Sequence, residues 1–190
     1  STVNITDAEG GNIQTGEAAD VVNITASIAD VADVASGETF IVDTDGGNDV
    51  ITLDDLIDSS YIINAGEALD TSGNLIFNDM DIDTVVIDGD TNLGTGPLDL
   101  SNVEILDIGG TGDNTLSLTA IDVLDASDDT NILIITGNNG DELASSDVWS
   151  TGGTDVGVDG NIYDVYTFDT GVGIATLLVD SSAIDTSGLS

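Results

Sequence analysis

The sequence predicts an all-β fold, either a β-sandwich or a β-solenoid-like stack, in which helix is limited to short turns. Short runs rich in Val, Ile, Thr and Leu alternate with clusters of Asp, Gly and Asn, which is the pattern of strands joined by turns. The 190 residues include 23 Gly and a single Pro, so turn-forming residues are abundant. Two phrases also recur. VNIT occurs at Val3–Thr6 and Val22–Thr25, and turn glycines followed by an acid and an apolar strand occur at Asp45–Leu53, Gly109–Leu118 and Gly137–Leu143.

The apolar runs are each about five residues long, the usual length of a strand, and turn residues separate them. In chain order the predicted strands are Val21–Thr25, Thr39–Val42, Val50–Leu53, Tyr61–Asn64, Asn74–Phe77, Thr84–Ile87, Val103–Ile108, Thr115–Leu118, Asn131–Thr136, Ile162–Phe168 and Ile174–Val179. Helix is scarce, and three segments are each expected to form a turn or two: Ser27–Ala35, Asp54–Asp58 and Ala120–Ala126.

The whole chain, residues 1–190, is expected to form a single domain. Its one proline, Pro97, follows the glycine-rich Gly94–Gly96, so a boundary between two packed lobes is placed near 94–99. At this length two lobes would share one core or pack closely.

The net charge excludes two classes of partner. The chain has 37 Asp and Glu residues and no Lys, Arg or His, a formal net charge of −37. A nucleic-acid surface needs cationic side chains to neutralise phosphates, and docking to an anionic membrane leaflet needs them as well. No apolar run approaches the ~18 residues of a membrane span. We therefore expect no nucleic-acid partner and no membrane insertion.

The same charge predicts dependence on external cations. Self-repulsion opposes compaction and no internal cation offsets it, although 40% of residues are hydrophobic and a core can form. Asp outnumbers Glu by 31 to 6, and the short Asp carboxylate is favoured in turns and in calcium-binding loops. Halophily also gives acidic surfaces, but a halophilic protein normally keeps some Lys or Arg. We therefore expect a compact fold stabilised by several Ca²⁺ ions, and an extracellular location, since weak calcium sites fill only at about 0.1–1 mM calcium.

Two loops have the acid spacing of a calcium-binding loop, in which carboxylates and carbonyls supply the ion's oxygen ligands. The loop at 43–54 begins DTDGGND and the loop at 88–99 begins DGDTNLG, and each has an acid at its twelfth position. Neither is flanked by two convincing helices, so both are interpreted as calcium loops within β structure, with plain acidic turns as the alternative. The candidate metal ligands are Asp43, Asp45, Asp49 and Asp54 in the first loop and Asp88, Asp90, Asn92 and Asp99 in the second.

Two further groups of acids are candidate metal ligands. Gly109–Ser117 matches the calcium-binding RTX nonapeptide G-G-x-G-x-D-x-U-x, except that Asn114 replaces the aspartate, so Asp113 and Asn114 are candidate ligands of a weakened site. Separately, three acids two residues apart share one strand face, where a metal site and a solvated face are equal alternatives because unscreened acids at this spacing repel. These are Asp79, Asp81 and Asp83.

Longer phrases resemble modules of very large RTX adhesins, calcium-dependent proteins that bacteria export by type I secretion. They are DTVVIDGD, NVEILDIGGTGDNTLSLTAIDVLDAS, TGNNGDEL, the isolated Trp149 before Gly152-Gly153, GNIYDVYTF and ATLLVDSSAI. Together they run from Asp83 to about Ile184, just over half of the chain. The resemblance implies a cell-adhesion and biofilm module on the bacterial cell surface, monomeric within a longer chain. For a peptide-binding domain of such adhesins, it further implies a calcium ion that holds the C-terminal carboxylate of a surface protein on a host or neighbouring cell.

Enzymatic function is not expected. The usual nucleophile–base pairs need His, Cys or Lys in one role, which leaves carboxylate-only glycoside hydrolysis. Such enzymes usually line their sugar cleft with aromatic residues, and this chain has only seven, namely one Trp, three Tyr and three Phe.

Two functions remain, a binder of a peptide or glycan and a calcium-rigidified spacer of a long stalk. Spacers are typically shorter and come in tandem, which favours the binder. A protein without cationic side chains can bind an anion only through backbone N–H groups or a bound metal, and glycine-rich turns beside calcium offer both. Tyr163 and Tyr166 are expected on opposite faces of one strand, so at most one enters a pocket. The candidate ligand-binding residues are Asp88, Asp90, Gly94, Gly96, Trp149 and Tyr163.

Overall fold

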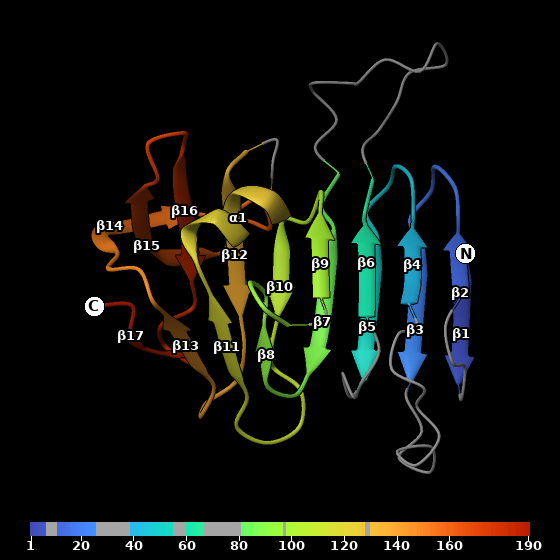
Figure 1. Ribbon diagram of the computed structural model, residues 1–190, viewed down its shortest axis with the longest axis horizontal. Coiled ribbons are helices and arrows are strands. Elements are labelled where there is room, and N and C mark those ends of the chain that lie inside the picture. The colour runs from blue at the N-terminus through green and yellow to red at the C-terminus, as the bar shows by residue number, and fades with distance from the viewer. Residues whose placement is uncertain (7–10, 26–38, 55–59, 67–80, 97, 128–129) are drawn as a thin grey trace.

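The computed structural model describes residues 1–6, 11–25, 39–54, 60–66, 81–96, 98–127 and 130–190. In these ranges the chain winds into a parallel β-solenoid whose coils stack side by side (Figure 1). The all-β prediction is confirmed, and of its two forms the solenoid is the one observed.

One sheet runs the length of the molecule, and we call it the long sheet. Its strands are parallel and in register from coil to coil, except that a hairpin at the C-terminal end adds two antiparallel strands. In spatial order they are β1 (Thr2–Thr6), β3 (Val21–Thr25), β5 (Val50–Asp54), β7 (Thr84–Asp88), β10 (Ile105–Asp107), β12 (Ile132–Thr136), β16 (Ile174–Val179), β15 (Ile162–Asp169) and β14 (Ser150–Val156).

Two shorter parallel sheets complete the coils. The first short sheet lies toward the N-terminal end of the stack of coils and the second toward the C-terminal end (Figure 1). The first contains β2 (Gly11–Gln14), β4 (Thr39–Asp43), β6 (Ser60–Asn64) and β9 (Leu98–Ser101), and the second contains β8 (Thr91–Asn92), β11 (Thr115–Leu118), β13 (Glu142–Ser145) and β17 (Asp185–Gly188).

The core consists of aliphatic columns, because the register sets each inward residue on its equivalent in the next coil. Val22, Ile51, Val85 and Leu106 pair in four successive coils, and each is 0% exposed. Alternate residues of these strands face outward, which is the period-two pattern of a strand with one buried face. Each buried aliphatic side chain stabilises the fold by roughly 1.5–3 kcal/mol relative to its exposed state.

The repeated VNIT phrase marks two neighbouring coils. Val3 pairs with Val22 and the register continues to Thr6 and Thr25, so the copies lie directly side by side in β1 and β3. The Asn23 side chain donates a hydrogen bond to Asn4 Oδ1 at 2.7 Å. The internal repeat seen in the sequence is therefore confirmed as a structural one.

Helix α1 (Ala120–Ala126) lies where the sequence predicts it. Thr119 caps its N-terminus in a capping box with Asp122, in which Thr119 N–H donates to the Asp122 carboxylate at 2.6 Å. Of the other predicted helices, Ser27–Ala35 lies outside the described residues. Only Asp54 of the segment 54–58 is described, and it ends β5. The strand predicted at Asn74–Phe77 also lies outside them.

Seven strands were not predicted, and the strand predicted at 103–108 is shorter, with β10 spanning Ile105–Asp107. Most of the seven are short, polar or glycine-rich, such as the STGGTDV segment of β14. They form because an aligned neighbouring strand supplies their main-chain hydrogen bonds, so pairing overrides weak β propensity. They are β1, β2, β8, β9, β13, β14 and β17.

The C-terminal end of the core is closed by aromatic residues. Trp149 packs against Phe168 with ring centroids 5.9 Å apart, and its indole N–H donates to Ser145 Oγ at 3.0 Å. Tyr166 donates its hydroxyl proton to Thr186 Oγ1 at 2.9 Å. The proposed lobe boundary at 94–99 falls between β8 and β9, and both the long sheet and the main group of buried side chains extend across it.

Candidate binding groove and acidic turns

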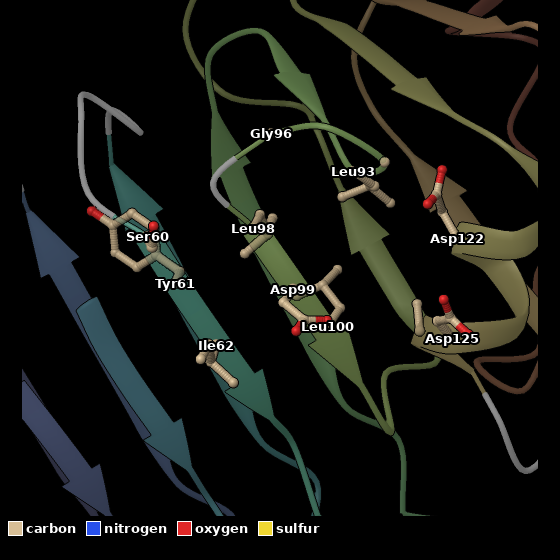
Figure 2. Close-up of a pocket in the computed structure, with 12 residues that line it drawn as sticks. Ser60, Tyr61, Ile62, Leu93, Gly96, Leu98, Asp99, Leu100, Asp122 and Asp125 are labelled. Atoms are coloured by element: carbon tan, nitrogen blue, oxygen red, sulfur yellow. The ribbon is translucent and has the colours of Figure 1, made fainter. Parts of the chain in front are cut away.

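A groove of about 390 Å³ lies between the first short sheet and helix α1 (Figure 2). The first short sheet ends at β9, and helix α1 contacts β9. In one coil β9 follows β8, and in the next coil α1 follows β11, so α1 takes the place that a further strand would have. The groove thus forms where a helix replaces the next strand. Its size is within the ~300–1,000 Å³ usual for ligand pockets. It is lined by Ser60, Tyr61, Ile62, Leu93, Gly94, Gly96, Leu98, Asp99, Leu100, Asp122, Asp125 and Ala126.

The groove combines carboxylates with apolar surface. Asp122 is already engaged in the helix cap, where it accepts from Thr119 N–H and from its hydroxyl at 2.8 Å. Asp99 and Asp125 are exposed, and among the residues that the structure describes neither carboxylate has a hydrogen-bond partner. Ile62 contributes apolar surface and is 43% exposed.

Two glycines shape one end of the groove. Asn92 Oδ1 accepts the N–H of Thr95 at 3.1 Å and holds the turn closed. A Cβ on Gly96 would lie 1.9 Å from the Asn92 carbonyl oxygen, and one on Gly94 would lie 3.0 Å from Asp122 Oδ2. Glycine is therefore needed for the turn to close tightly beside α1.

A second feature is a column of acids where the coils enter the long sheet. Asp20, Asp49, Asp83 and Glu104 each precede a strand of that sheet, and its register aligns them. The last three carboxylates each accept the main-chain N–H of the acid one coil earlier, while Asp20, the first, accepts from the Ser1 amino group and from Gly16 N–H. Asp20 donates to Asp49 Oδ1 at 2.7 Å, Asp49 to Asp83 Oδ1 at 2.7 Å, and Asp83 to Glu104 Oε2 at 2.8 Å. We call these four residues the acid column.

Burial changes the protonation of this column. Asp49 and Asp83 are each 1% exposed. Burial raises the pKa of Asp83 to about 9, and repulsion from Glu104, Asp49 and Asp81 raises it further. The hydrogen bond from Asp49 N–H acts in the opposite direction and lowers this pKa. Burial also raises the pKa of Asp49.

One oxygen of the column is buried without a partner. Among the described residues, Asp49 Oδ2 is buried and has no hydrogen-bond partner. The nearby Thr44 hydroxyl donates its single proton to the Ala65 carbonyl at 2.8 Å. The Ser1 amino group pairs with the Asp20 carboxylate at one end of the column. The chain has no Lys, Arg or His, so the counter-charge of the buried Asp49 and Asp83 has to be a proton or a cation from solution.

The RTX-like segment forms a turn beside the second short sheet. Gly109–Asn114 joins β10 to β11, and Leu116 of β11 pairs with Thr91 on one side and Leu143 on the other. Asn114 is 4% exposed and donates to the Ile108 carbonyl at 3.0 Å. Asp141, its equivalent in the next coil, accepts from Asn114 N–H at 2.9 Å and from Asn138 N–H at 2.6 Å. These side chains therefore cap main-chain groups of adjacent turns.

Substitution of Gly110 tests this stacking. Thr111 N–H and hydroxyl both donate to Asp88, at 2.8 and 3.1 Å to Oδ1, and a Cβ on Gly110 would lie 2.4 Å from the same oxygen. We expect Gly110→Ala to lower the free energy of unfolding by about 1–3 kcal/mol, the range of an overpacked site, in urea denaturation. Gly16→Ala is the matched control, since nothing lies within 4 Å of its Cβ position. Equal effects of the two changes would contradict the tight packing of Asp88.

The predicted metal ligands fall into separate places. Asp43 accepts from the Asn64 side chain at 3.3 Å, Asp45 has a φ of 54°, and Asp54 is exposed at the end of β5. Asp79 lies outside the described residues. The predicted groups at 43–54 and 79–83 do meet, because Gly47 N–H donates to Asp81 Oδ2 at 3.0 Å and Asp49 contacts Asp83. Asp20 and Glu104 were not among the predicted site residues. The sequence signal that could have identified them is an acid directly before each apolar run.

The loop predicted at 88–99 is divided. Asp88 and Asp90 lie beside the RTX-like turn, where Asp90 accepts from Thr115 N–H at 2.9 Å, and Asp113 is exposed there. Asn92 holds the glycine turn, while Asp99 lies in the groove with Gly94 and Gly96. In the described ranges no group of three or more acidic side chains is placed to hold a metal ion. The oxygen donors and the unpartnered Asp49 Oδ2 nevertheless suit a hard cation such as Ca²⁺.

The aromatic candidates occupy the core. Trp149 is 5% and Tyr163 4% exposed, which leaves little surface for contact with a ligand. Tyr163 and Tyr166 belong to different groups of buried side chains, as the prediction of opposite strand faces requires. Tyr163 donates to Asp159 Oδ2 at 2.7 Å, and burial together with this hydrogen bond raises its pKa to about 12.

Compared with protein-family models, curated proteins and solved structures, the chain matches none. Among the described residues, no helix has the length and apolarity needed to span a membrane.

Proposed function

We propose that this protein is a calcium-dependent adhesion module on the outside of a bacterial cell, part of a large RTX adhesin exported by type I secretion, that binds a peptide of a partner's surface. The observation that carries the proposal is the acid column in a chain of net charge −37 without Lys, Arg or His. Asp20 is paired with the Ser1 amino group, but the buried Asp49 and Asp83 need a counter-charge from solution. Calcium is a hard cation that binds oxygen ligands and is available outside the cell.

Two places would hold calcium in this proposal. Asp49 and Asp83 of the acid column, with Asp81 beside them, offer carboxylate oxygens that include the unpartnered Asp49 Oδ2. In the groove, Asp122 and the main chain of the 93–96 turn offer oxygens at the glycine end. Bound calcium supplies the positive charge that the chain lacks, so neighbouring coils no longer repel each other.

The groove supports a binder over a spacer. A spacer needs no concave site, whereas this solenoid has one where α1 interrupts the first short sheet. The charged side chains that line the groove are all carboxylates, so we propose that an anionic ligand is attached there through a bound cation. The free C-terminus of a partner peptide suits such a site, because its carboxylate can ligate calcium while its chain lies along β9.

A peptide screen tests this function. Peptides with free C-termini are screened against the domain in millimolar calcium, and the C-terminus of each hit is then amidated. We expect amidation or EDTA to weaken binding at least tenfold, because either change removes the carboxylate–calcium contact. We also expect affinity to improve with salt, since screening reduces the repulsion between the ligand and the acidic domain. Binding that survives either change would disprove the mechanism, and binding to a glycan array alone would make the groove a sugar site.

A further inference from the structure

We propose that the groove beside α1 also selects a basic residue, Lys or Arg, in the partner peptide. This inference rests on the proposed function, which places a partner peptide in the groove, and it adds the kind of side chain that the groove recognises.

The first argument is charge complementarity. Asp99 on β9 and Asp125 on α1 lie on two sides of the groove (Figure 2). Both are exposed, and in the described part of the chain neither carboxylate has a hydrogen-bond partner. Asp122 differs, because the helix cap already uses it. Since the chain contains no Lys, Arg or His, any cationic side chain that pairs with Asp99 and Asp125 has to come from a partner.

The second argument is the apolar surface beside these carboxylates. Ile62 is 43% exposed and Leu93 is partly buried, and both line the groove. Lys and Arg carry long aliphatic stems that cover apolar surface while the charged end reaches a polar group. A Lys or Arg side chain across Ile62 would therefore cover the apolar surface with its aliphatic stem and pair its charged group with the carboxylates.

A bare metal ion fits this part of the groove less well. Among the described residues, the groove lining offers no third free carboxylate beside Asp99 and Asp125, because its other acid, Asp122, is used by the helix cap. A guanidinium has several N–H donors spread over a plane and can bridge two separated carboxylates. The geometry thus points to a cationic side chain at Asp99 and Asp125, apart from the glycine end of the groove.

The test uses a blocked peptide that has no free terminus. Acetyl-Gly-Ser-Leu-Arg-Gly-Ser-amide is titrated into ¹⁵N-labelled domain in calcium, beside the same peptide with citrulline in place of Arg. Citrulline keeps the shape and removes the charge. We expect the Arg peptide to shift amide signals of residues 93–99 and 120–126, and to bind at least tenfold more tightly than the citrulline peptide. Its affinity should fall as salt rises, because opposite charges attract.

Variants of the domain locate the contact. Asp99→Asn and Asp125→Asn should each weaken the Arg peptide at least threefold, whereas Glu17→Gln, which removes one charge from an exposed turn, should leave it unchanged. The inference would be overturned by any of three results: equal binding of both peptides, amide-signal shifts spread over all acidic turns, or no binding at 10 mM peptide. The proposed function fails separately, because it depends on a free C-terminus that these peptides lack.

Discussion

Transfer from millimolar calcium to EDTA is expected to lower the thermal unfolding midpoint of this domain by more than about 10 °C. A ligand that binds only the folded state stabilises it by roughly 2.7 kcal/mol per site at a hundredfold excess over its Kd. A domain of this size changes its midpoint by about 2–4 °C per kcal/mol, so two or more sites would give such a shift. The acid column and the other stacked turns would regain their full repulsion once calcium is removed.

The measurement is circular dichroism at 218 nm during heating, at equal ionic strength in both buffers. Magnesium in place of calcium serves as the control for general charge screening, because Mg²⁺ gives up its hydration water reluctantly and fits irregular sites poorly. An equal midpoint in calcium and EDTA would remove the calcium proposal and leave protonation and monovalent ions as the counter-charge of the acid column.

Asp83→Asn is expected to stabilise the calcium-free domain at pH 8 and to flatten its dependence on pH. The pKa of Asp83 is raised from 3.8 to about 9 in the folded state. Between these values the folded state holds a proton that the unfolded state has released, so stability falls as pH rises from about 4 to 9. Asn stays neutral at every pH and keeps an oxygen that can accept the Asp49 N–H. This difference in proton binding would be worth several kcal/mol at pH 8, so we expect the midpoint of the variant to rise by more than about 5 °C.

The comparison is made in EDTA from pH 4 to pH 9, where the two midpoints should converge at the acidic end. Glu17→Gln removes one charge from an exposed turn and controls for the general relief of repulsion. In calcium the sign should reverse, because a bound ion favours the ionised carboxylate that Asn lacks. A variant less stable than the parent at pH 8 in EDTA would show that Asp83 is stabilising as a carboxylate.

The strands of the long sheet could largely be predicted because their signal is local. Val21–Thr25, Val50–Asp54 and Thr84–Asp88 are short runs rich in Val, Ile, Leu and Thr between turn residues, so each is recognised as a strand in isolation. The VNIT repeat was a further signal, of repeated units along the chain. Strands such as β14 carry no local signal, since Ser150–Val156 is exposed throughout and forms by pairing with β15.

The site could be predicted only in part, because its contacts depend on register. Asp49 meets Asp83 across 34 residues of sequence, and Asp83 meets Glu104 across 21, so unequal coil lengths hide the acid column from any fixed spacing. The glycine turn and Asp99 were identified, but Asp122 and Asp125 were assigned only to a helix. Their role in the groove appears once α1 is placed beside β9.

The two ends of the chain lie at opposite ends of the stack of coils (Figure 1), which determines how the module would respond to mechanical tension. Tension between the ends acts along the stacking direction, the same direction as the hydrogen bonds that join one coil to the next. Such a load separates coils in succession and does not shear all strands at once. The carboxylate-to-amide bonds of the acid column also run from coil to coil, so they share this load, and their protonation or metal binding would set the force at which the first coils part.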